Sequence, residues 1–159
     1  MTIDGTYCEI QEPSTFDKMW FSHKFKGPGL RYEVAVCIQT GDIVWINGPY
    51  KCGRWPDITI FRHRLKALLL PREQVEADKG YRGDENVRHR KMARSYAELQ
   101  AKKVARARHE TINVRLKKWG ILSQVFRHDW NKHFHVFMAV AVLTQISFER
   151  GFRPYQVNY

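Results

Sequence analysis

The stretch Tyr32–Asn47, YEVAVCIQTGDIVWIN, decides the fold that we expect for this chain. In its first half, apolar side chains recur at every second position, which is the period of a pleated strand. The dipeptide Gly41-Asp42 then makes a tight turn into a second apolar run. The pattern predicts strands at 32–39 and 43–47, joined as an antiparallel hairpin.

The segments around this hairpin supply one earlier strand, one later strand and three helices. Proline and glycine mark most of the boundaries between them. The expected elements are a strand at 2–10, the hairpin, a helix from Pro56-Asp57 to before Pro71, a strand at 74–77, a long helix at 87–119 closed by Gly120, and a helix at 129–149. We therefore expect an α/β fold with a mixed sheet, ordered β-β-β-α-β-α-α, with helices packed on the sheet. That order resembles the start of the ribonuclease H-like arrangement.

The composition indicates one folded domain. The chain has 159 residues, of which 43% are hydrophobic and 13% aromatic, enough to bury a core. We expect residues 1–159 to form this domain, with 120–159 as its C-terminal helix and tail. Three scattered cysteines, without a C-x-x-C pair, favour a reducing compartment. The longest apolar run, 134–148, is interrupted by polar residues, so we expect no membrane span and an intracellular protein.

The charge is strongly positive and unevenly distributed. The formal net charge is +11, and residues 82–118 alone hold twelve basic against four acidic side chains. Concentrated positive charge favours a polyanionic partner, because each neutralised phosphate releases condensed counterions. The alternative is a solvated basic helix without a partner.

Four acidic residues occupy the expected element ends. Asp4 lies in the first strand, Asp57 begins the first helix, Asp78 follows the fourth strand, and Glu110 lies within the basic helix. Taken singly, these are ordinary positions for a strand-edge residue, a helix cap, a turn former and a surface acid. Taken together, such carboxylates can hold two Mg²⁺ ions about 3.5–4 Å apart, the arrangement that cleaves phosphodiesters.

The blocks around these acids resemble a known family, the DDE transposases, and within it the PIF/Harbinger-type enzymes and nucleases derived from them. The resemblance runs from Asp4 to about Trp119. The matching blocks are Asp4-Gly5-Thr6, Gly53-x-x-x-Asp57, Asp78-Lys79-Gly80-Tyr81 and Arg106-x-x-x-Glu110.

The resemblance implies metal-dependent cleavage of DNA on a ribonuclease H-like fold. Its catalytic residues would be Asp4, Asp78 and Glu110, which would hold two Mg²⁺ ions, or Mn²⁺ as a substitute. Asp57 would be a fourth, accessory metal-binding carboxylate. The block before it reads Gly-Arg-Trp-Pro-Asp, whereas the family more often has a small residue and His before the Asp. This difference leaves the role of Asp57 open.

Basic residues share the helix face of Glu110. At about 100° per residue, Lys103, Arg106 and Lys117 lie within about 60° of it. We expect these three, together with Arg82 and Arg54, to contact the DNA backbone. An apolar stripe lies roughly opposite Glu110, which leaves its direction open, with Glu98 and Asp84 as alternatives for the third acid.

The expected function is that of a DNA endonuclease or transposase catalytic domain. The alternative is a catalytically inactive, transposase-derived domain that binds DNA or protein. The chain begins three residues before Asp4, so we expect it to lack an upstream DNA-binding region. DNA is the expected partner, and a separate DNA-binding protein or domain and oligomerisation both remain open. The nucleus is the expected location if the source is eukaryotic.

A second aromatic and basic cluster lies outside these blocks. Trp20, Phe21 and Phe25 alternate with lysines in the insertion at 16–29. The composition suits stacking on unpaired bases, and it equally suits a loop held in place by its own aromatic side chains.

Overall fold

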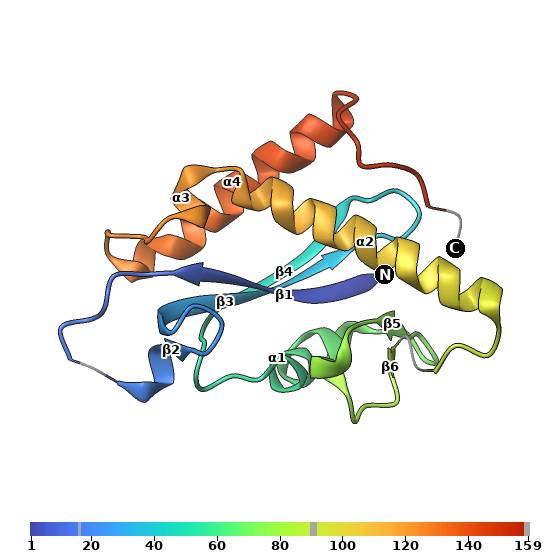
Figure 1. Ribbon diagram of the computed structural model, residues 1–159, viewed down its shortest axis with the longest axis horizontal. Helices are drawn as coiled ribbons and strands as arrows, with labels where there is room; N and C mark the ends of the chain where they lie inside the picture. Colours follow the sequence, from blue (N-terminus) through green and yellow to red (C-terminus); the bar gives the residue numbers. More distant parts are fainter. Residues whose placement is uncertain (16, 90–91, 158–159) are drawn as a thin grey trace.

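A mixed six-stranded sheet is the centre of the computed structural model, which describes residues 1–15, 17–89 and 92–157 (Figure 1). The strands are β1 (Thr2–Glu9), β2 (Phe21–Ser22), β3 (Gly27–Val36), β4 (Ile43–Lys51), β5 (Val75–Glu76) and β6 (Val87–Arg88). β3 pairs antiparallel with β1, β4 and β2. β5 runs parallel to β1, and β6 runs parallel to β5. The expected mixed α/β fold is confirmed at this level.

Helices pack on both faces of this sheet. They are α1 (Asp57–His63), α2 (Tyr96–Lys117), α3 (Gly120–Ser123) and α4 (His133–Glu149), with 3-10 turns at Lys18–Trp20, Leu65–Leu68, Lys79–Tyr81 and Trp130–Lys132. The long helix α2 crosses the sheet near β1, with α4 beside it, while α1 lies near β5 and β6 (Figure 1). In the described part of the chain, we find no helix with the length and apolar character that crossing a membrane requires.

The alternation in β3 divides the core into two clusters. Tyr32 and Val34 face α2 and α4, where they join a cluster that includes Phe137. Ala35 points to the other face and packs with Phe61 of α1. The predicted period of two therefore assigns each side chain of this strand to one face, as a sheet covered on both sides requires.

The structure corrects the long helix expected at 87–119. Residues 87–88 form β6 instead, and α2 begins only at Tyr96. Residues 90–91 of that expected helix lie outside the described residues. Composition favours helix throughout this segment, but pairing with β5 outweighs a propensity of a few tenths of a kcal/mol per residue.

Other expected boundaries also shift. β4 continues through Gly48-Pro49 to Lys51, beyond the expected end at 47, and β3 starts at Gly27 rather than at 32. Gly120 begins the short helix α3, after α2 has ended at Lys117. Asp129 caps a 3-10 turn, so that α4 starts four residues later than expected. The ends of helices and strands are the positions that the local sequence pattern determines least, because the terminal residues can adopt the conformation of the element or of the adjoining loop.

Within the aromatic insertion, the structure favours the self-packed interpretation for Trp20. Its side chain is buried and meets Trp130 edge to face, with ring centroids 4.9 Å apart. Phe25 packs against Gly29, where a Cβ would meet the Phe25 ring. Phe16 lies outside the described residues.

A buried histidine connects the sheet to α4. The ring of Tyr32 stacks on Phe137 at 3.9 Å, and its hydroxyl hydrogen-bonds to Nδ1 of His133 at 2.8 Å. Burial, and secondarily the charge of Lys117, lowers the pKa of His133 from 6.5 to about 4. The imidazole is therefore neutral in the folded protein at neutral pH.

This burial predicts a loss of stability in acid. Below pH 6.5 the unfolded chain protonates His133, whereas the folded chain does so only near pH 4, so the free energy of unfolding falls across this window. Relative to His133→Gln, the wild type should lose about 2 kcal/mol between pH 7 and pH 5. Urea denaturation of both proteins at the two pH values measures this. The exposed His128→Gln variant is the control, and an equal pH dependence in wild type and His133→Gln would contradict the prediction.

Candidate functional site

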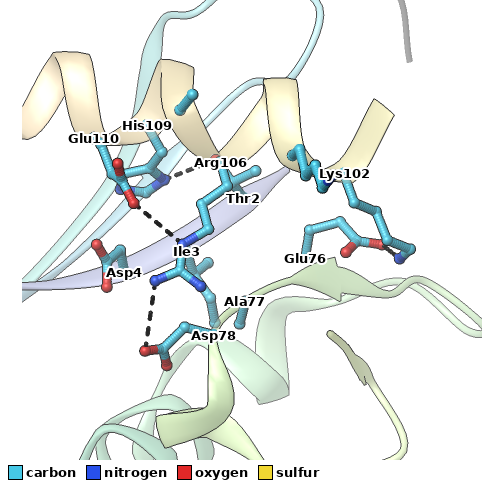
Figure 2. Close-up of a pocket in the computed structure, with 12 residues that line it drawn as sticks. Thr2, Ile3, Asp4, Glu76, Ala77, Asp78, Lys102, Arg106, His109 and Glu110 are labelled. Carbon is cyan, nitrogen blue, oxygen red and sulfur yellow. Dashed lines mark hydrogen bonds and ion pairs between the residues drawn. The ribbon is translucent and has the colours of Figure 1, made fainter. Parts of the chain in front are cut away.

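The parallel pairing of β1 with β5 places two of the predicted acids side by side. Thr2 lies opposite Glu76 in the register of the two strands. Asp4 and Asp78 each follow two residues later along the same direction. Asp4, within β1, and Asp78, just after the end of β5, are therefore neighbours across the strand pair, and both line a cavity of about 350 Å³ between the sheet and α2 (Figure 2).

The Asp4 carboxylate is held at both oxygens. The backbone N–H of Gly5 donates to Oδ1 at 2.8 Å, and the side-chain amide of Asn113 donates to Oδ2 at 3.2 Å. Asn113 is itself oriented by the hydroxyl of Thr6, which donates to its Oδ1 at 2.7 Å. Burial raises the pKa of Asp4 to about 6, and the negative charge of Asp78 adds to the effect. Asp4 is thus a fixed and desolvated carboxylate.

Asp78 begins the 3-10 turn that follows β5. Its Oδ1 accepts the N–H of Gly80 at 2.6 Å, an arrangement that fixes the turn. Its Oδ2 lies 4.0 Å from the guanidinium of Arg106 on α2, and about a third of its side chain is exposed. Asp78 can therefore be reached from outside, unlike most of Asp4.

Asp57 lies close to both segments that carry the other two aspartates, the strand β1 at Gly5 and the 3-10 turn at Gly80. A Cβ at Gly5 would come within 2.8 Å of its Oδ1, and a Cβ at Gly80 within 2.7 Å of its Oδ2. Its Oδ1 is 3.2 Å from the guanidinium of Arg31, whose side chain is only 12% exposed. Burial raises the pKa of Asp57, and Arg31 opposes that effect. Asp57 thus lies against β1 and the Asp78 turn, and it forms an ion pair with a poorly exposed arginine.

Glu110 approaches the cavity from α2. Its side chain is 61% exposed, and its Oε1 is 3.3 Å from Nε of Arg106. Figure 2 shows the Arg106 side chain between Glu110 and Asp78, with Asp4 beside it. The structure thus brings Asp4, Asp78 and Glu110 around one cavity, with an arginine among them. The alternatives Glu98 and Asp84 are held in ion pairs elsewhere.

The predicted DNA-binding residues take different positions. Lys103 lines the cavity, as does Arg106. The ammonium group of Lys117 donates instead to the backbone carbonyls of Tyr7 and Leu122, and so fastens α2 to β1 and α3. Arg54 and Arg82 are exposed and do not line this cavity.

Two further residues of α2 that line the cavity, Lys102 and His109, were not among the candidates that the sequence indicated. Lys102 is buried and forms an ion pair with Glu76. His109 is 2% exposed and hydrogen-bonds through Nδ1 to Thr2, and burial lowers its pKa to about 3. Lys102 and His109 lie about four turns and two turns before Leu116 on α2, a spacing that places them on the same helix face as this buried residue and so indicates that they face the sheet.

The donor set suits a hard divalent cation, although the carboxylates are not gathered as a finished metal site. Within residues 1–15, 17–89 and 92–157, no three side chains of Asp, Glu, His or Cys are grouped so that they could hold a metal ion. The donors of Asp4 and Asp78 are all oxygen atoms, the type that Mg²⁺ prefers. The negative charges of Asp4 and Asp78 repel each other, and a bound cation would reduce this repulsion.

The comparisons with known proteins give one match. A protein-family model described as DDE superfamily endonuclease matches residues 3–145, which is most of the chain and includes Asp4, Asp78 and Glu110. Neither the curated proteins nor the solved structures contain a significant match.

The hydrogen bonds of Asn113 predict a specific defect. Asn113→Leu keeps the side-chain volume but leaves Asp4 Oδ2 and the buried Thr6 hydroxyl without their partner, so the free energy of unfolding should fall by about 1–3 kcal/mol. Urea denaturation measures it. The control is Thr111→Val on the same helix, which removes only a hydroxyl bonded to the Ala107 carbonyl and should cost under about 0.5 kcal/mol. Equal losses in both variants would refute the role of Asn113.

Proposed function

The chain belongs to the DDE superfamily endonuclease family, and from this premise we propose that it is the catalytic domain of a metal-dependent DNA endonuclease or transposase. The observation that carries the proposal is the placement of Asp4 and Asp78 side by side across the parallel β1–β5 pair, with Glu110 on the facing helix and all three around one cavity. Rigid elements that present carboxylates to a shared cavity provide what phosphodiester cleavage needs.

We further propose a ribonuclease H-like fold of the PIF/Harbinger type. The strand neighbours β4-β3-β1-β5-β6, with the first three antiparallel and the last two added in parallel, support this fold. The blocks Asp4-Gly5-Thr6 and Asp78-Lys79-Gly80-Tyr81 support the subtype.

In this proposal, Asp4 and Asp78 are the principal ligands of Mg²⁺, or of Mn²⁺ in its place, and Glu110 is the third carboxylate. When bound, two such ions make a water molecule nucleophilic and stabilise the leaving oxygen. Because Arg106 is ion-paired with Glu110 and close to Asp78, it must release them before both acids can turn to a cation.

The remaining residues bind and orient. Gly5 and Asn113 hold the two oxygens of Asp4, so that this carboxylate does not reorganise during the reaction. Lys103 and Arg106 are positioned to bind the phosphate oxygens of the strand that enters the cavity. Arg54 and Arg82 are proposed as outer contacts to the DNA backbone. Asp57 is an accessory carboxylate that packs against Gly5 of β1 and against the turn after Asp78, next to the two principal ligands.

The second candidate is a catalytically inactive domain that binds DNA or protein. It is favoured by the pairing of Arg106 with the acids and by the altered block Gly-Arg-Trp-Pro-Asp that ends at Asp57. The enzyme is the better hypothesis, because the three acids meet at one cavity. DNA as the partner implies an intracellular location, the nucleus in a eukaryote, and leaves open a separate DNA-binding protein and an oligomer.

Plasmid nicking tests this function. We expect the full chain to nick supercoiled DNA with Mg²⁺ or Mn²⁺ but not with EDTA. Asp4→Asn, Asp78→Asn and Glu110→Gln should each lower the rate by about 100-fold or more, because each removes one charged ligand.

The matched control for this assay is Asp129→Asn, which changes an exposed cap far from the cavity to another good capping residue. It should cut like the wild type. If Asp78→Asn still cuts DNA, the site assignment is wrong. If the wild type cuts DNA with neither Mg²⁺ nor Mn²⁺, the inactive domain is favoured.

Replacing Asp57 should affect stability more than cutting, unlike replacement of Asp4, Asp78 or Glu110. Asp57→Asn leaves the poorly exposed Arg31 without its ion-pair partner, so we expect stability to fall by about 1–3 kcal/mol. Cutting measured well below the melting temperature should fall less than about tenfold. Urea denaturation and nicking on the same samples measure both. If stability is unchanged and cutting is abolished, Asp57 is a ligand and not an accessory group.

A further inference from the structure

A second, larger cavity of about 790 Å³ adjoins the acidic one. Asp78, Arg106 and Ala77 line both, so the two cavities meet at the Asp78 carboxylate. From there the second cavity extends to the start of α2, at Arg94 and Tyr96. We call this second cavity the α2 groove. Its volume lies in the range of about 300–1,000 Å³ that holds small organic ligands.

Cations dominate the walls of the α2 groove. Lys79, Arg94 and Arg106 line it, and Asp78 is its one carboxylate among the described residues. In the described part of the chain, the side chains of Lys79 and Arg94 form none of the observed ion pairs. They are therefore available to a ligand, and their charge selects an anion such as a phosphate.

An exposed aromatic ring lies at the far end of the groove. Tyr96 is 76% exposed, an unusual position for a large ring, and Ala93 and Leu99 add apolar surface beside it. Its backbone is firmly placed, because the Ser95 hydroxyl accepts the N–H of Glu98 and the Glu98 carboxylate accepts the N–H of Arg94. This reciprocal capping presents the ring from a defined helix start.

We propose that the α2 groove binds unpaired nucleotides of the strand whose phosphate lies at Asp78, with a base stacked on Tyr96 and phosphates bound by Lys79 and Arg94. The identity of that phosphate rests on the proposed function. Cations alone would suffice for a duplex backbone. An exposed ring beside apolar side chains offers a stacking surface to the face of an unpaired base, whereas duplex bases are already stacked on one another.

Binding to short labelled oligonucleotides tests the groove. Fluorescence anisotropy is measured in EDTA, which prevents cutting, with a ten-nucleotide oligothymidylate and a ten-base-pair duplex. Tyr96→Ala should weaken binding to the single strand by about tenfold and leave duplex binding unchanged, whereas Tyr96→Phe should bind like the wild type. Lys79→Ala and Arg94→Ala should each lower the salt slope of single-strand binding by about one ion.

Tyr155→Ala is the matched control, because Tyr155 is another exposed tyrosine, 47% exposed, on the C-terminal tail. It should not change binding. Photocrosslinking of the wild type to a bromouridine-substituted strand should label the peptide around Tyr96. The proposal is overturned if Tyr96→Ala binds like Tyr155→Ala, if it weakens duplex binding equally, or if the crosslinks fall elsewhere.

The two proposals fail separately. If the protein does not nick DNA but binds single strands through Tyr96, the proposal for the α2 groove stands and the proposed nuclease activity is wrong. If nicking depends on Asp78 but single-strand binding does not depend on Tyr96, the nuclease proposal stands and the groove proposal is wrong.

Discussion

The site depends on one short contact, the parallel pairing of β1 with β5. A single register pair, Thr2 with Glu76, sets it. Because parallel neighbours run in the same direction, the acids two residues further along each chain segment, Asp4 within β1 and Asp78 just after β5, lie side by side. An antiparallel partner, or a slip by one residue, would send one of the two carboxylates to another edge or face. The rest of the cavity is built around this pair.

Glycine makes the close approach of three acids possible. Gly5 of strand β1 and Gly80 of the turn after Asp78 both face the Asp57 carboxylate, and a Cβ at either position would overlap it. The start of α1 therefore packs directly against β1 and this turn. Gly5 and Gly80 are therefore required because a side chain would collide with Asp57, and not because the backbone needs the conformational freedom of glycine.

The protein balances buried acids within a strongly basic chain. Repulsion and burial raise the pKa of Asp4 to about 6, while Arg31 and Arg106 lie close to the other carboxylates. A cation held there would relieve the repulsion, and the surrounding net charge of +11 would draw in a polyanion. The carboxylates at the cavity and the basic residues around them would therefore attract opposite charges, a metal cation and a polyanion respectively.

The sequence by itself determined the alternating strand at Tyr32 and the mixed α/β class, and it singled out Asp4, Asp78 and Glu110, which line one cavity, because strand period and block spacing are local properties. Only the tertiary structure decided that 87–88 form a strand, that Lys117 binds backbone carbonyls, and that Asn113 holds Asp4. Asn113 and Asp4 are 109 positions apart. Periodicity within one segment assigns a residue to a face of that segment, but its partner on that face comes from another segment, which only the folded packing brings into contact.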